Sequence, residues 1–322
     1  MAGLKMNINL SRMNKQLLST FSGLFILIVV FTILSEYFFS VNNLLTVATQ
    51  TAVIAIIAIG QTYVLITGGI DLSIGSNIAL TAIIAGFCMK LSPEPSVPLI
   101  LAAMLLSLMT GALAGAISGT LITFGKIPPF IATLGTMTVA RGIALTLTKG
   151  LPVSGLPRKF TVLGTGFTLG IPNPVIIMVM LVLLFGFLLA KTKLGRHIYA
   201  VGSNFEAARL SGVNTQKTLI TVYIFSGILA AAAGLIVAAR VISAHPAAGD
   251  GYELDAVASS VIGGTSTMGG EGTVAGTFIG AFIIGVLRNG LNLINVSPFI
   301  QRIVIGIVIV GSVFFDRIKR KD

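Results

Sequence analysis

The chain has 322 residues, of which 55% are hydrophobic and only 10% are charged. A soluble domain carries roughly 25% charged residues, so this composition strongly disfavours a soluble enzyme. A disordered chain is excluded because disorder requires low hydrophobicity. The net charge of +11 does not call for a nucleic-acid partner, because multi-span membrane proteins carry extra lysine and arginine in their cytoplasmic loops. The composition therefore indicates a polytopic membrane protein.

Apolar segments follow one another along the chain, separated by short polar turns. A segment of about 20 residues is long enough to cross a bilayer as a helix. We expect spans at about 17–34, 44–67, 72–89, 97–124, 129–148, 172–190, 218–240, 273–294 and 298–315. The short, glycine-rich segment 256–270 either crosses marginally or dips into the membrane and returns. The pattern predicts an all-α fold of about ten transmembrane helices in one domain, residues 1–322.

The positive charges predict the orientation of the chain in the membrane. With the N-terminus inside, thirteen lysines and arginines fall on inner segments and four on outer loops. The thirteen include Lys5 near the start and Arg320 and Lys321 at the end. Because such residues are enriched on the cytoplasmic side, we expect both termini inside and an even number of crossings.

Glycines recur at four-residue spacing in two of the predicted spans. They are Gly111, Gly115 and Gly119 in the first half, and Gly272, Gly276 and Gly280 in the second. This spacing places them on one helix face, where a neighbouring backbone can approach closely. Each set lies near a glycine-rich break, at 68–75 and 263–272, which suggests a five-plus-five internal repeat of the kind that transporters use.

Asp71 is the most unusual polar residue in the predicted spans. It follows Gly68 and Gly69, and a carboxylate in lipid costs roughly 3 kcal/mol on insertion scales. One interpretation is an ion-coupling or substrate-facing carboxylate. The other is a helix cap that accepts from the free N–H groups of the following helix. The adjacent glycines favour the cap.

Other polar side chains in the spans are candidates for the lining of a translocation path. Arg288 either pairs with a carboxylate or lines a polar cavity, and the partner of Arg141 cannot be named from the sequence. The candidate path residues are Asp71, Asn77, Arg288 and Asn292.

An acidic cluster, Asp250, Glu253 and Asp255, precedes segment 256–270. Catalytic carboxylates would need a defined pocket and partners, and nothing in the sequence marks one. We therefore expect a solvated outer loop, or carboxylates at a helix start before Ala256.

The sequence predicts no enzyme. Gly125-Lys126 is followed by Ile127, whereas a phosphate-binding Walker A loop needs Ser or Thr after its lysine. The two histidines, His197 and His245, fall in segments expected on opposite sides of the membrane, so they form no metal pair. We expect no catalytic residue, no metal and no cofactor, and any ATP must be bound by another chain.

The inner loop 191–217 is the longest polar stretch inside the chain. Asn204 suits a helix N-cap, Glu206 suits the positive helix start, and Gly212 suits a left-handed stop. The pattern predicts a short helix over 204–212. Because so short a helix is marginal alone in water, it either docks on a surface or serves as an amphipathic connector.

The same loop carries the first family resemblance. Glu206-Ala207-Ala208 followed after three residues by Gly212 resembles the EAAxxxG loop of permease subunits in bacterial ATP-driven (ABC) importers. Further strings resemble the simple-sugar branch of that family, nearly over the whole chain and in order. They are 195–204, 209–214, 68–73, 130–135, 251–258 and 263–266.

The resemblance implies a multi-subunit importer in the bacterial inner membrane that carries a simple sugar such as ribose. Two permease subunits, here expected as a homodimer, would form the pore, with a periplasmic sugar-binding protein outside and an ABC ATPase inside. Loop 191–217 would then be the cytoplasmic coupling loop. Its ATPase-coupling residues would be Asn204, Glu206, Ala207, Ala208, Arg209 and Gly212.

Two other classes of function remain open at this stage. A secondary carrier would couple sugar import to protons or sodium through Asp71 and would need no ATPase. A membrane enzyme is the weakest alternative, because no nucleophile, metal set or carboxylate pair is arranged for chemistry.

Overall fold

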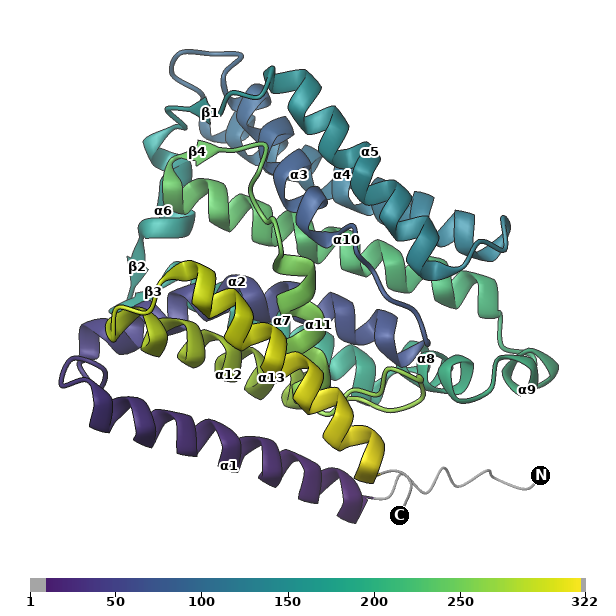
Figure 1. Cartoon of the computed structure of the whole chain (residues 1–322). Helices are drawn as coiled ribbons and strands as arrows, with labels where there is room; N and C mark the ends of the chain where they lie inside the picture. Colours follow the sequence, from purple (N-terminus) through teal and green to yellow (C-terminus); the bar gives the residue numbers. More distant parts are fainter. Residues whose placement is uncertain (1–9, 320–322) are drawn as a thin grey trace.

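A computed structural model describes residues 10–319 as thirteen α-helices and four two-residue strands (Figure 1). The first five helices are α1 (Leu10–Leu34), α2 (Val41–Ile66), α3 (Ile74–Met89), α4 (Val97–Thr123) and α5 (Pro129–Thr148). The later helices are α6 (Arg158–Thr165), α7 (Asn173–Lys191), α8 (Lys193–Ser203), α9 (Phe205–Leu210), α10 (Thr215–Val241), α11 (Tyr252–Ile262), α12 (Val274–Leu293) and α13 (Pro298–Lys319). Lys5, Arg320 and Lys321 of the charge count lie outside the described residues.

Seven of the described helices are long and apolar enough to cross a membrane: α1, α2, α4, α5, α7, α10 and α12. The prediction of a polytopic, mostly helical protein is confirmed. The figure of ten crossings stays a prediction, because α3 and α11 are too short to span a bilayer by themselves. A helix of 16 residues is only about 24 Å long, and one of 11 residues about 16 Å.

Helices α2 and α10 form the centre of the molecule. Residues 51–66 of α2 are all buried, and α10 buries residues on every side against α2, α3 and α4. The predicted glycine ridge of α4 packs along α10. A Cβ added at Gly115 would lie 2.1 Å from the carbonyl oxygen of Tyr223, and one at Gly111 would lie 2.2 Å from that of Gly227. Glycine is therefore required at this crossing.

The second glycine ridge packs α12 against α11, but it is shorter than predicted. A Cβ at Gly276 would lie 2.0 Å from the carbonyl oxygen of Gly263, and one at Gly280 would lie 2.0 Å from that of Ser259. Gly272 belongs instead to the preceding loop, where its φ of +153° suits glycine.

Two helices begin after a non-helical segment inside the helical body. The chain leaves α2 at Ile66 and is non-helical over 67–73 before α3 starts. It is likewise non-helical over 245–251 before α11. Helix α11 starts at Tyr252, after the left-handed Gly251, and ends before Gly263. The expected apolar segment 256–270 was therefore placed several residues too late. The helix boundaries are set by the backbone conformation at glycines, which the apolar composition of a segment does not reveal.

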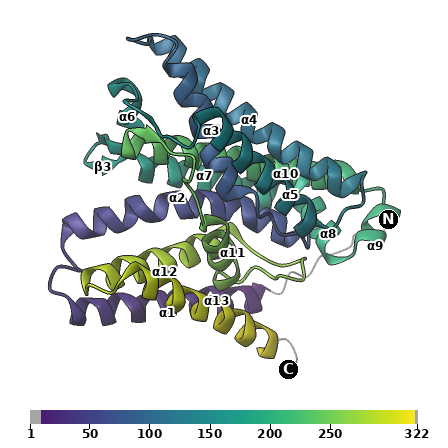
Figure 2. The same cartoon turned by 45° about the horizontal axis from the view of Figure 1, so that its top comes forward.

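The connection between α5 and α7 holds α6 and the strands β1 (Val153–Ser154), β2 (Phe167–Thr168) and β3 (Ile171–Pro172). Strand β1 pairs with β4 (Ser243–Ala244), and β2 pairs with β3. These strands lie at one end of the molecule, opposite α9. Figures 1 and 2 agree that α9 shares its end with the start of α1 and the end of α13.

Candidate functional site

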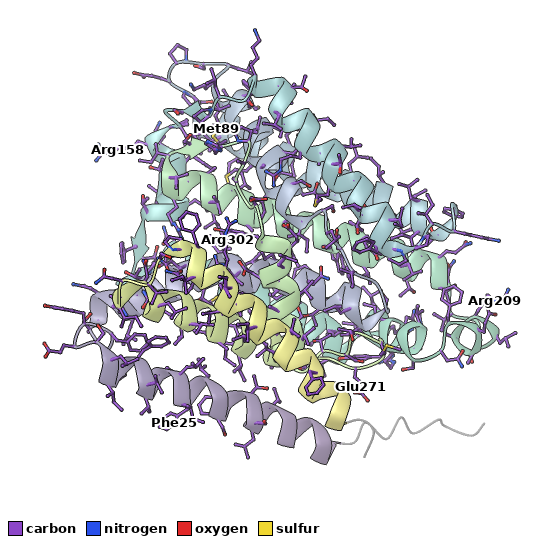
Figure 3. All side chains as sticks on the ribbon, viewed as in Figure 1. Phe25, Met89, Arg158, Arg209, Glu271 and Arg302 are labelled. Atoms are coloured by element: carbon purple, nitrogen blue, oxygen red, sulfur yellow. The ribbon has the colours of Figure 1, made fainter. Side chains whose placement is uncertain are left out.

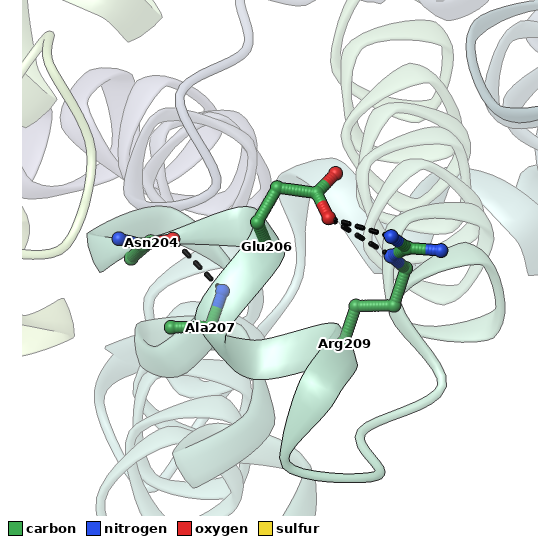
Figure 4. Close-up of polar contacts among 4 residues, drawn as sticks. All are labelled: Asn204, Glu206, Ala207 and Arg209. Atoms are coloured by element: carbon green, nitrogen blue, oxygen red, sulfur yellow. Dashed lines mark hydrogen bonds and ion pairs between the residues drawn. The ribbon is translucent and has the colours of Figure 1, made fainter.

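Helix α9 has the cap and the stop that its sequence predicts, and Figure 4 shows the cap. The backbone N–H of Ala207 donates to Oδ1 of Asn204 at 2.9 Å, and Gly212 follows with a φ of +82°. Glu206 and Arg209 form an exposed ion pair of 2.8 Å between Oε2 and Nη2. Figure 3 shows Arg209 at the end of the molecule opposite Arg158.

The outer face of α9 is open. Ala208 is its one buried residue, whereas Leu210 is 82% exposed and Phe205 is also exposed. An apolar side chain so exposed beside a charged pair is typical of a surface that another protein covers. The sequence predicted one helix over 204–212; the structure has a shorter α9 and a separate helix α8 before it.

Helix α8 connects α9 to the end of α2 and to the loop between α11 and α12. The hydroxyl of Tyr199 donates to the carbonyl oxygen of Gly272 at 2.6 Å. A Cβ at Gly202 would lie 1.7 Å from the carbonyl oxygen of Ile66, the last residue of α2, and the N–H of Gly270 donates to that same oxygen at 2.8 Å. Displacement of α8 would therefore be felt at the end of α2 and in the loop between α11 and α12.

Asp71 is fully buried at the start of α3 and has three hydrogen bonds. Its Oδ1 accepts from the N–H of Ser73 at 2.9 Å and from the hydroxyl of Ser73 at 2.6 Å. Its Oδ2 accepts from the hydroxyl of Ser226 on α10 at 2.7 Å. Asn77, also fully buried, donates to the hydroxyl oxygen of Ser73 at 3.0 Å. The structure thus brings two candidate path residues, Asp71 and Asn77, into one cluster that fixes the start of α3.

Arg288 forms an ion pair with Asp255, for which the sequence had left open a solvated outer loop or a helix start. Its Nη2 donates to Oδ2 of Asp255 at 2.7 Å and to Oδ1 at 2.8 Å. Asp255 is 2% exposed, so the alternative of a solvated outer loop is wrong for this residue, which lies in the first turn of α11. The pair connects α11 to α12.

Arg141 has backbone partners. Its Nη1 donates to the carbonyl oxygens of Pro246 at 2.6 Å and of Ala248 at 3.0 Å. These carbonyls belong to the non-helical segment before α11, so α5 supplies the hydrogen bonds that a helix would otherwise provide.

Asn292 is exposed. The nearby Asn289, one helical turn earlier, is the asparagine that forms hydrogen bonds with another helix. Asn289 and Asn43 exchange two amide hydrogen bonds of 2.9 and 3.0 Å between α12 and α2. Nothing in the sequence could have paired them, because they lie 246 residues apart.

Residues 43–313 match the family described as permease component of branched-chain amino acid transport systems. The chain is 46% identical over 307 residues to the ribose import permease protein RbsC of Bacillus subtilis, covering 94% of each chain. It is 38% identical over 303 residues to the D-allose transport system permease protein AlsC of Escherichia coli, covering 94% of this chain and 92% of the relative. It is 33% identical over 340 aligned residues to the xylose transport system permease protein XylH of the same species, covering 87% and 86%. No solved structure gives a significant match.

Proposed function

Since this chain belongs to the family of permease components just described, we propose that it is the membrane-spanning permease subunit of an ATP-driven importer of a simple sugar. The full-length similarity to ribose import permeases carries the proposal. The family description mentions branched-chain amino acids, but the three relatives above transport ribose, allose and xylose according to their names. Ribose or a similar monosaccharide is therefore the proposed cargo.

The membrane arrangement is part of the proposal. The protein lies in the bacterial inner membrane, with the end that carries α9 in the cytoplasm and the end that carries β1–β4 in the periplasm. Helices α3 and α11, each together with the non-helical segment before it, make two further crossings, and with α13 the total is ten. The single domain covers residues 1–322.

A five-plus-five repeat agrees with the order of the elements. Helices α2, α3, α4 and α5 run as long, short, long, long, and α10, α11, α12 and α13 repeat that order. A non-helical segment precedes the short helix in both cases. Helix α4 packs along α10, while α12 packs along α2, so equivalent helices contact the opposite half, which supports an internal repeat.

A separate ATPase would drive transport through loop 191–217. The ATPase would hold Phe205, Leu210 and the Glu206–Arg209 pair. Closure of the ATPase would then displace α8, which contacts the end of α2 through Ile66 and the α11–α12 loop through Gly272. A second copy of this chain would complete the pore, and a periplasmic sugar-binding protein would deliver the sugar.

Co-purification from native membranes tests the assembly. The intact complex, extracted in mild detergent, should contain this chain, an ABC ATPase and, in the presence of sugar, a soluble sugar-binding protein. A chain that purifies alone and imports sugar into vesicles without ATP would overturn the proposal and favour the secondary carrier.

The observation behind that alternative is the buried Asp71. The N-cap of α3 is Ser73, so Asp71 is not the helix cap that the sequence favoured. Its three hydrogen bonds and its complete burial agree better with a structural carboxylate that fixes segment 67–73 than with a group that meets a solute. The carrier hypothesis requires that collapse of the ion gradient stops uptake and that Asp71→Asn abolishes it.

A further inference from the structure

A cavity that is open to the outside, lined by both polar and apolar side chains, lies at the end of the molecule opposite α9, between α2, α10 and the β2–β3 hairpin. Its volume is about 420 Å³, within the range of about 300–1,000 Å³ typical of small-molecule sites. One wall is a polar face of α2, formed by Asn42, Thr46, Thr49 and Gln50. Polar side chains facing lipid on a spanning helix are costly, so this face of α2 calls for water or a polar ligand.

The polar groups of the cavity are free to bind. Among the described residues, the amides of Asn42 and Gln50 have no hydrogen-bond partner, and the guanidinium of Arg240 has no carboxylate within ion-pair distance. The hydroxyls of Thr46 and Thr49 donate to carbonyls of their own helix at 2.8 and 2.7 Å, so their oxygens remain as acceptors.

The chemistry of this set favours a neutral sugar. Each amide offers both donors and an acceptor, as vicinal hydroxyls do, and the planar guanidinium can donate to two adjacent hydroxyls. No acidic side chain is among the lining residues, which disfavours a cation. A phosphate dianion has no donors, so it would leave the amide oxygens unsatisfied. The exposed ring of Phe167 at the rim offers an apolar surface for a sugar face.

We propose that this cavity, lined by Asn42, Thr46, Gln50, Phe167 and Arg240, is a monosaccharide subsite of the permease itself. The inference rests on the proposed function. The sugar would bind at this subsite first, after the soluble receptor releases it to the permease. Its location, at the end opposite α9, places it on the proposed periplasmic side.

The test uses the purified full-length permease in lipid nanodiscs, without receptor or ATPase. Binding of radiolabelled D-ribose, D-allose and D-xylose is measured by equilibrium dialysis, with D-ribose 5-phosphate as the anionic probe. We expect saturable binding of at least one neutral sugar, weakened about tenfold by Gln50→Leu, which removes the hydrogen bonds of the amide to a sugar hydroxyl. Thr46→Val, which keeps the shape of the side chain, should weaken binding less.

Gln216→Leu is the matched control, because Gln216 is an exposed glutamine at the opposite end of α10; its binding should equal that of the wild type. The subsite is overturned if no neutral sugar binds, if the phosphate binds more tightly than the sugars, or if Gln50→Leu and Thr46→Val bind like the wild type. Uptake by cells that contain receptor and ATPase separates the two proposals. Sugar uptake by the wild type without permease binding contradicts the subsite alone, whereas a lack of sugar uptake contradicts the proposed function.

Discussion

The two non-helical segments inside the helical body are stabilised by different chemistry. Segment 67–73 is fixed by a buried carboxylate, Asp71, and by serine hydroxyls, one of them on α10. Segment 245–251 is held by Arg141 from α5, and the helix after it by Arg288 from α12. Segment 245–251 contains left-handed glycines at 249 and 251, whereas segment 67–73 contains one, Gly68.

The difference indicates which segment is built to move. Segment 67–73 is fixed to the central pair of helices through short side chains that have few alternative positions. Segment 245–251 is held by one long side chain from another helix, Arg141. It also has two left-handed glycines, against one in segment 67–73, and glycine permits alternative backbone conformations. We expect segment 67–73 to stay fixed and segment 245–251 to rearrange during transport.

The largest effect should come from Arg288→Met. It leaves the Asp255 carboxylate buried without its partner, and breaking a buried pair in this way costs about 3 kcal/mol or more. The free energy of unfolding, measured by denaturant titration in mixed micelles, should fall accordingly. The double variant Arg288→Met/Asp255→Leu should recover most of that loss, and no recovery would contradict the pairing.

Asp71→Asn should have a smaller effect, about 2 kcal/mol, because it weakens charge-assisted hydrogen bonds but keeps the shape of the side chain. ATP-driven uptake per folded molecule should be retained, because all three hydrogen bonds of the carboxylate go to groups of the protein itself. Complete loss of uptake by a correctly folded variant would instead favour the ion-coupled carrier.

Arg141→Lys should have the smallest effect on stability, about 1 kcal/mol, since an ammonium can replace one of the two hydrogen bonds to carbonyls. Hydrogen exchange should quicken in segment 245–251 and stay unchanged in 67–73. If hydrogen exchange quickened equally in both segments, Arg141 would not hold segment 245–251 specifically, and the proposed difference in mobility would be contradicted.

The local features could be predicted from the sequence, and the long-range pairs could not. Asn204 and Gly212 predicted the cap and the stop of α9 because helix ends are set by residues within one turn. The partner of Arg288 lies 33 residues away on another helix, and only the three-dimensional packing brings it close. The start of α11 was missed because Gly251 sets it through its backbone conformation, whereas the apolar pattern begins later.

The candidate site shows the same division. The short helix of loop 191–217 was predicted from a short motif and from local capping rules. The contacts by which α8 reaches Ile66 and Gly272 could not be found from the sequence, because they join segments far apart in the chain. The polar residues of α2 around Gln50 recur in the sequence at three- and four-residue spacing. Only the structure shows that they line a cavity together with Arg240 of α10.

ATP-driven sugar uptake by variants of α9 tests the central claim most directly. The complete transporter, with its receptor and ATPase, is compared for Glu206→Lys and Gly212→Pro, with Glu206→Asp and Gly212→Asn as conservative controls, since asparagine tolerates a left-handed backbone. The account predicts that the first two variants reach the membrane at normal levels but do not import sugar, while the controls do. Normal uptake by both Glu206→Lys and Gly212→Pro would show that α9 does not transmit the action of the ATPase.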